Sequence, residues 1–218
     1  MKVLRNYWQF ISFGLLIIVI GFLFLGNGKQ LPLLQKIMIY QFMALLAHQS
    51  EEYIFPGGAS LVINRGTYKE KDNFKRYPGN TQSILLVNLS AYIPYILGII
   101  CYRQIWLGVA IAFFSLMQFP GHVISMNKAL KTWYNPGMAT TIFILTPLSV
   151  AYFVSCYQLG VIHGIDYLFG ALTFILIVIL TVILPVQSLK NPKSPYVISD
   201  KQISKFEKVM SWAKLKKD

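Results

Sequence analysis

Six apolar segments, each close to the length that crosses a lipid bilayer, constrain this sequence more than any other feature. They cover residues 7–25, 33–55, 83–102, 105–126, 138–159 and 167–185, which is more than half of the 218-residue chain. About 20 apolar residues cross the hydrocarbon core as a helix, and lipid offers no partners to unpaired backbone groups. The segments lack the alternation that is typical of barrel strands. The sequence therefore predicts an all-α integral membrane protein with a bundle of about six transmembrane helices.

Composition and charge support the same class. Hydrophobic residues make up 55% of the chain and charged residues only 13%, whereas soluble domains contain about 25% charged residues. A net charge of +12 would indicate a nucleic-acid partner in a soluble protein, but in so apolar a chain we expect no nucleic acid. The two cysteines, Cys101 and Cys156, lack CxxC spacing, which excludes a zinc ribbon. A disulfide between them stays open, and buried free thiols are the favoured interpretation.

The distribution of basic residues predicts the topology. With six spans, 17 of the 20 lysines and arginines lie on the side that carries both termini, and only Lys29, Lys36 and Arg103 lie on the other. Because cytoplasmic loops are enriched in basic residues, we expect a multi-pass cell-membrane protein with both termini in the cytoplasm. Five spans would divide the basic segments between the two sides. The second segment is the weakest candidate span, because it contains Lys36, Gln41, His48, Glu51 and Glu52.

The pattern of apolar and basic segments predicts that the chain has three parts. Residues 1–30 form a first transmembrane anchor with a short loop, residues 31–187 a transmembrane core, and residues 188–218 a basic cytoplasmic tail. The first segment follows Lys2 and Arg5 as a signal peptide would, but it lacks a small-x-small cleavage site and is interpreted as retained, with a cleaved signal as the alternative. Residues 199–218 alternate apolar side chains with lysines. This predicts a basic amphipathic helix on the anionic headgroups of membrane lipid, with a solvated helix as the alternative.

The ionisable residues inside the second segment are the first candidates for chemistry, because such groups are costly in a membrane and mark functional sites. His48, Glu51 and Glu52 are spaced i, i+3 and i, i+4, so one helix face carries all three. An imidazole with one or two carboxylates could hold Zn²⁺, Fe or Mn²⁺, and a remaining carboxylate could act as general base on bound water. A histidine–carboxylate pair that bonds neighbouring helices is the structural alternative.

Depth in the membrane connects this face with a second histidine. A helical rise of ~1.5 Å per residue places His48 roughly 10 Å, Asn88 about 8 Å and His122 about 6 Å inside the predicted cytoplasmic ends of their segments. His122 is therefore expected to join the same site. His163 and Asp166 fall on the outer side, roughly 20–30 Å away. We interpret them as a separate surface pair, with Asp166 as the N-cap of a helix.

Three short motifs follow one another along the chain. Residues 48–53 read His-Gln-Ser-Glu-Glu-Tyr and are followed by Pro-Gly-Gly at 56–58. His122 lies four residues after Gln118, and Tyr134, Asn135, Pro136 and Gly137 precede the fifth segment. In this order the motifs resemble the HXXEE, NxxxH and YxPG motifs of the HXXEE-domain family of small integral membrane proteins, with Gln118 in place of the asparagine. The resemblance covers roughly residues 40–185 and implies a membrane domain of unknown function.

These observations predict a membrane-embedded metal-dependent enzyme, a hydrolase or an oxidoreductase. Its substrate is expected to be a lipid-like or membrane-associated molecule at the cytoplasmic leaflet, and a metal-free variant would use a glutamate to activate water. An ion- or proton-coupled transporter is one alternative. A non-catalytic immunity or structural membrane protein is another, in which the polar cluster joins the helices. The sequence leaves the oligomeric state open.

Each candidate residue has an expected role in the enzyme. The candidate metal ligands are His48, Glu51, Glu52 and His122, for Zn or Fe and also for Mn. The candidate catalytic residues are Glu51, Glu52 and Tyr134. The residues expected to orient water or substrate are Asn88, Gln118 and Asn135.

Overall fold

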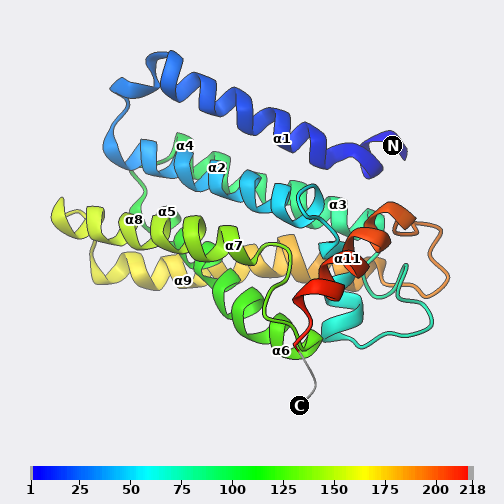
Figure 1. The fold of residues 1–218 in the computed structure, drawn as a ribbon. Coiled ribbons are helices and arrows are strands. Elements are labelled where there is room, and N and C mark those ends of the chain that lie inside the picture. Colours follow the sequence, from blue (N-terminus) through cyan, green and yellow to red (C-terminus); the bar gives the residue numbers. More distant parts are fainter. Residues whose placement is uncertain (1, 216–218) are drawn as a thin grey trace.

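Helices account for the regular structure of residues 2–215, the range that the computed structural model describes (Figure 1). Within that range, five helical stretches are long and apolar enough to cross a membrane. They are Val3–Leu25, Thr81–Ile100, Ile105–Leu130, Met138–Gln158 and Gly164–Leu189. The chain therefore has the all-helical architecture and the apolar helices of a membrane protein.

The second predicted span, helix α2 (Leu33–Tyr53), is a continuous helix but is not among these five. Polar residues such as Gln35, Lys36 and Gln41 interrupt its apolar sequence, so composition alone does not mark it as a span. It nevertheless lies inside the bundle, where it packs against α1 (Lys2–Leu25), α4 (Tyr92–Ile100) and α8 (Thr146–Gln158) (Figure 1). Thirteen of its 21 residues are buried. The predicted six helices are thus five apolar stretches and one more polar helix between them.

Four of the apolar stretches consist of consecutive helical pieces. These are α3 (Thr81–Ser90) with α4; α5 (Ile105–Phe119), a π-helical turn (Pro120–Met126) and α6 (Asn127–Leu130); α7 (Met138–Thr140), a π-helical turn (Thr141–Leu145) and α8; and α9 (Gly164–Val178), a π-helical turn (Ile179–Ile183) and α10 (Leu184–Leu189). In each of the four stretches, one later piece has a proline among its first three residues: Pro94 in α4, Pro120 in the π-helical turn after α5, Pro147 in α8 and Pro185 in α10. Proline explains the interruptions, because it cannot donate the helical hydrogen bond.

The basic segments that were predicted to share one side of the membrane lie together at one end of the bundle. Arg5 Nη1 donates to Gln82 Oε1 at 3.2 Å, and the Trp133 amide donates to the Ala213 carbonyl at 3.1 Å. Helix α11 (Asp200–Ala213) crosses this end beside the start of α3 (Figure 1). Between α2 and α3, the chain forms a 3₁₀ turn (Ala59–Leu61) and a π-helical turn (Val62–Thr67) at the same end.

Helix α11 is amphipathic, as predicted, but its apolar face is covered by protein. Ile203, Phe206 and Val209 are buried, the first two in a cluster with Leu61 and Val62. The sequence led us to expect these side chains on lipid headgroups. The turns at residues 59–67 supply an apolar surface that removes them from water, which sequence periodicity alone cannot reveal. Contact between the basic face of α11 and headgroups stays a prediction.

The opposite end of the bundle carries the second histidine–acid pair. Helix α9 begins at Gly164, two residues earlier than Asp166, so the prediction of Asp166 as N-cap is wrong. Asp166 lies in the first turn instead, and its carboxylate accepts the backbone N–H of His163 at 2.9 Å. Both cysteines are free thiols, but only Cys156 is buried and Cys101 is exposed.

Candidate metal centre

Three side chains from two segments converge near the end of α2. His48 and Glu52 lie one turn apart on α2, and His122 comes from the π-helical turn that follows α5. Glu52 Oε1 lies 3.8 Å from His48 Nε2 and 3.6 Å from His122 Nε2. The two imidazoles are nearly perpendicular, with centroids 5.0 Å apart. All three potential ligand atoms lie within 4.8 Å of one another, so the predicted meeting of these residues is present in the structure.

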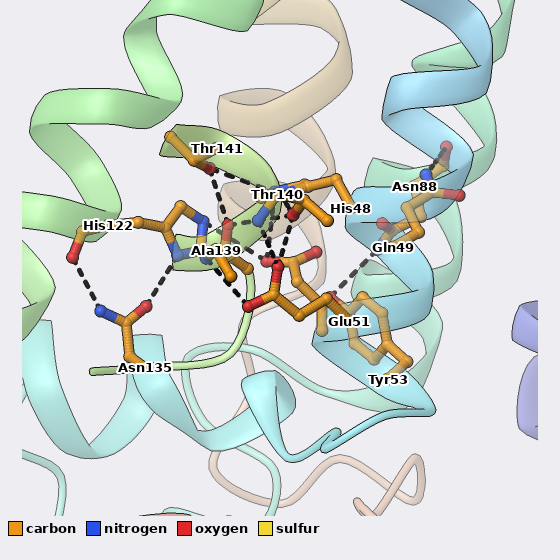
Figure 2. A network of polar contacts seen from close by, with 12 residues as sticks. His48, Gln49, Glu51, Tyr53, Asn88, His122, Asn135, Ala139, Thr140 and Thr141 are labelled. Atoms are coloured by element: carbon orange, nitrogen blue, oxygen red, sulfur yellow. Dashed lines mark hydrogen bonds and ion pairs between the residues drawn. The ribbon is translucent and has the colours of Figure 1, made fainter. Parts of the chain in front are cut away.

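The hydrogen bonds of Thr140 determine which nitrogen of His48 carries the proton. The Thr140 hydroxyl donates to Glu51 Oε2 at 2.5 Å, so Thr140 Oγ1 can only accept from His48 Nδ1, 3.0 Å away (Figure 2). The hydroxyl of Thr141 donates its one proton to the Gly137 carbonyl at 2.7 Å, so it has none left to donate to His48. His48 therefore holds its proton on Nδ1 and presents the lone pair of Nε2 to Glu52.

Asn135 orients His122 in the same way. Its amide nitrogen donates to the His122 carbonyl and to Asn127 Oδ1, both at 2.7 Å. Its oxygen therefore faces His122 Nδ1, also at 2.7 Å, and accepts the proton of the ring (Figure 2). Asn135 is fully buried, which fixes this arrangement. His122 also presents an Nε2 lone pair to Glu52.

Three hydrogen-bond acceptors thus face a common point. When both imidazoles are neutral, the two Nε2 lone pairs and the Glu52 carboxylate repel one another unless a proton or a cation lies between them. Protein metal sites use this arrangement, in which Nε2 binds the metal while Nδ1–H is held by a neighbouring acceptor. Two nitrogens and one carboxylate suit Zn²⁺, Fe²⁺ or Mn²⁺, and three protein ligands leave a coordination position open.

Glu51, the neighbouring acid, has very different surroundings. Its carboxylate accepts four hydrogen bonds. One comes from Tyr134 Oη at 2.6 Å. The others come from the Ala139 amide at 3.0 Å and from the Thr140 amide and hydroxyl at 2.7 and 2.5 Å (Figure 2). These bonds join α2 to the first turn of α7, where unpaired amides favour a negative charge. Glu51 was predicted as a ligand and a base, but it lies outside the group of three.

Tyr134 is bonded to Glu51 and lies outside the group of three convergent residues. Burial, followed by the hydrogen bond to Glu51 and the charge of Glu51, raises the pKa of Tyr134. The hydroxyl therefore stays protonated as a donor to Glu51. Its ring stacks on Trp212 of α11, with centroids 5.2 Å apart. The structure connects Tyr134 with Glu51 and with the covering helix.

Two of the residues predicted to orient water or substrate lie apart from the group. Asn88 donates to Tyr53 Oη at 3.2 Å and to the Ile84 carbonyl at 2.8 Å, next to the end of α2 (Figure 2). Gln118 is half-buried one helical turn before His122. In the described part of the chain, no hydrogen bond joins Asn88 or Gln118 to the two histidines or to Glu52.

Gly137 allows the backbone to approach all three convergent residues. Its φ of +100° is a conformation that other residues rarely adopt. A Cβ atom there would lie 2.5 Å from His122 Cε1, 2.8 Å from His48 Cε1 and 3.0 Å from Glu52 Cγ. Sequence reasoning gave no role to Gly137 beyond its place in a motif, and none to Thr140, which lies three residues after that motif.

An open groove reaches Glu51 from the outside of the bundle. It has a volume of about 420 Å³ and is lined by Phe13 of α1, Ala47 of α2, and Glu51 and Thr140 at its polar end. It shares Leu16 and Ala47 with a mostly apolar groove of about 620 Å³ between α1, α2 and α8. An apolar path therefore runs along α2 toward the polar residues.

Comparison with known proteins gives a family but no activity. A family model described as "Protein of unknown function with HXXEE motif" matches residues 39–152, just over half of the chain. A search of curated proteins and a search of solved structures found no match. The predicted range was roughly residues 40–185. The match begins within one residue of that start but ends at residue 152 in α8, short of residue 185. It contains all three convergent residues and excludes α1, α9 and α11.

Proposed function

The chain belongs to the HXXEE family of proteins of unknown function, and from the geometry of its buried site we propose that it is a membrane-embedded metal-dependent enzyme. One observation carries the proposal. Three acceptor atoms, Nε2 of His48, Nε2 of His122 and Oε1 of Glu52, converge while both ring protons are held by other residues. A divalent cation satisfies all three acceptors at once.

The proposed topology has six spans with both termini in the cytoplasm. Support comes from the 17 of 20 basic residues in the terminal and loop segments that share one side in this topology, and from the position of α2 among apolar helices. In this topology the end of α2 lies near the cytoplasmic leaflet, so the site faces substrates that enter from that side or from the leaflet itself.

Each residue of the centre has a role in the proposed chemistry. His48, His122 and Glu52 would hold Zn²⁺, Fe²⁺ or Mn²⁺, and such a metal polarises a bound water or a carbonyl or phosphoryl oxygen. Thr140 and Asn135 keep the two rings in the ligating tautomer. Since Glu51 already accepts four hydrogen bonds, the general base is the second carboxylate oxygen of Glu52.

Hydrolysis of a lipid-like or membrane-associated substrate fits this centre best. Hydrolysis requires only the metal, water and a base, whereas oxidation also needs a supply of electrons. The apolar grooves along α2 offer room for the chain of such a substrate, and their polar end at Glu51 and Thr140 adjoins the centre. Thr140 links the two, since it contacts both Glu51 and His48.

Metal analysis of the purified protein tests the proposal. The detergent-solubilised chain is equilibrated with Zn²⁺, Mn²⁺ or anaerobic Fe²⁺, freed of excess metal and measured by inductively coupled plasma mass spectrometry. We expect one ion per wild-type chain and none in His48→Ala or Glu52→Gln. The matched control His163→Ala, from the opposite end of the bundle, should retain the ion. A folded wild-type protein that takes up none of these metals contradicts the proposal.

A proton-coupled transporter is the second candidate, because a proton shared among the same three acceptors would also relieve their repulsion. Reconstitution into liposomes with a pH-sensitive dye inside separates the two functions. Proton flux that is lost in Glu52→Gln, in a protein that binds no metal, would favour the transporter.

A further inference from the structure

A pocket of about 310 Å³ lies at the same end of the bundle, between the start of α1, the start of α3 and helix α11. Its lining includes three cationic side chains, Arg5, Lys201 and Lys205, and no aspartate or glutamate from the described residues. Hydroxyl and amide groups, among them Thr81 and Gln202, complete the polar part. We propose that this pocket binds the phosphate headgroup of an anionic membrane lipid.

Arg5 is already positioned for such a ligand. One guanidinium nitrogen donates to Gln82 Oε1 at 3.2 Å, and the group lies 4.4 Å above the ring of Tyr196. These contacts fix the planar group and leave other N–H donors of the guanidinium for a phosphate, whose oxygens match its geometry. Within residues 2–215, no carboxylate forms an ion pair with Arg5, Lys201 or Lys205.

The two lysines lie one turn apart on α11. Lys205 Nζ donates to the Ile54 carbonyl at 2.6 Å and to the Tyr53 carbonyl at 3.4 Å, at the end of α2. Burial and then the positive charge of Lys201 lower the pKa of Lys205. Two like charges beside one pocket repel each other, and an anion between them and Arg5 would remove that repulsion.

The position of the pocket favours a lipid over a soluble phosphate. Two apolar stretches, Val3–Leu25 and Thr81–Ile100, begin at its rim. Tyr7 and Phe10 line it and are 57% and 44% exposed, and the apolar surface of α1 continues from them. Aromatic residues of this kind lie at the level of headgroups. A bound headgroup would therefore leave its acyl chains along α1. The inference uses the proposed topology and is independent of the metal.

Native mass spectrometry of the full chain in detergent tests the pocket. The protein is titrated with dioleoylphosphatidylglycerol and, separately, with dioleoylphosphatidylcholine. We expect preferential binding of the anionic lipid, weakened about fivefold by Arg5→Gln or Lys201→Gln and about 30-fold by both, since each removes one of the cations that line the pocket. Lys205 is left unchanged because it caps α2. The matched control is Lys208→Gln, an exposed lysine of α11 outside the pocket, which should bind as the wild type does.

Three results would overturn the proposal. Equal binding of the two lipids removes the anion preference, and an equal effect of Lys208→Gln and Lys201→Gln reduces it to general attraction by the basic helix. Glycerol 3-phosphate or inorganic phosphate that binds as tightly as the lipid would replace the lipid by a soluble ligand. Metal content, measured in the same variants, should equal that of the wild type, so failure of this inference is distinguishable from failure of the proposed enzyme.

Discussion

The two ends of the helix bundle each carry a histidine close in sequence to an acid, yet only one end assembles a candidate centre. His48 and Glu52 are separated by four residues, and His163 and Asp166 by three. The first pair is joined by His122, and both of these histidines are buried while Glu52 is partly exposed. In the second pair the histidine side chain is 71% exposed and lies 3.7 Å from the carboxylate.

The two ends differ in which protons their hydrogen-bond acceptors bind: the ring protons of the histidines at one end, and a backbone N–H at the other. At the buried end, Thr140 and Asn135 accept the ring protons, so the lone pairs of the rings face the acid. At the exposed end, the Asp166 carboxylate accepts a backbone N–H and serves the first turn of α9. Helical spacing brings two side chains together in both cases, but the hydrogen bonds behind them decide between a ligand set and a helix cap.

The largest expected contrast comes from two glycines with positive φ, Gly137 at the buried end and Gly160 at the other. Gly137→Ala should cost about 3–5 kcal/mol of unfolding free energy, because its methyl group would overlap the rings of His48 and His122 in addition to the left-handed strain. Gly160→Ala, with φ +65° and open space around it, should cost only about 1–2 kcal/mol. Denaturant titration in mixed micelles measures both. Equal losses would show that the close approach at Gly137 is unimportant.

The next contrast is between two acids with capping roles. Glu51→Gln should cost about 2–3 kcal/mol, because an amide cannot accept all four hydrogen bonds and leaves buried donors unpaired. Asp166→Asn should cost about 0.3–1 kcal/mol, the value of one charge at a helix N-terminus. The same titration measures the loss. Metal content should survive in Glu51→Gln, and its disappearance from a folded variant would return Glu51 to the ligand set.

A smaller effect is expected for the residue behind His122. Asn135→Ala leaves His122 Nδ1 without its acceptor, so metal affinity should fall about 10–100-fold. Competition with a zinc chelator measures this. Asn135→Asp keeps the acceptor for Nδ1 but sets an oxygen against the His122 carbonyl and Asn127 Oδ1, so it should recover only part of the affinity. If Asn135→Ala binds the metal as tightly as the wild type, the ring is not oriented through Nδ1.

The smallest effect is expected at the exposed end. His163→Ala should change the unfolding free energy by no more than about 0.5 kcal/mol, as for a surface substitution without a buried partner. Thermal unfolding in detergent checks the stability, and chelator competition should give wild-type metal affinity. A loss of affinity here would mean that the two ends are coupled.

The positions of the helices could be predicted from the sequence, because apolar length is a local property. Helix α2 was placed correctly within two residues at its end, and its polar character was evident from Gln41 and His48. The packing of α11 could not be predicted in the same way. Its apolar face is as compatible with lipid as with the turns at residues 59–67, and only the fold selects between them.

In the candidate site, too, some features could be predicted from the sequence and others depend on the fold. The meeting of His48, Glu52 and His122 followed from helical spacing and depth. The different roles of Glu51 and Glu52 could not follow from it, because the donors to Glu51 come from Ala139 and Thr140, 88 and 89 residues away. Two adjacent acids look equivalent in a sequence until their donors are known.

The polar character of α2 also affects how this protein is made. Lys36, Glu51 and Glu52 oppose the insertion of a lone α2, but each costs less than the about 2.5–3.5 kcal/mol of a charge at a helix centre, because all three lie near the ends of α2. Helix α2 is also synthesised before the amides that bind Glu51 exist. In the proposed topology, α2 must pack against neighbouring helices at the translocon until the fifth span, which carries the amides that bind Glu51, has been synthesised. The proposed centre therefore cannot form in a short nascent chain: its two histidines lie 74 residues apart, and the group that accepts the ring proton of His48 is Thr140, later still in the chain.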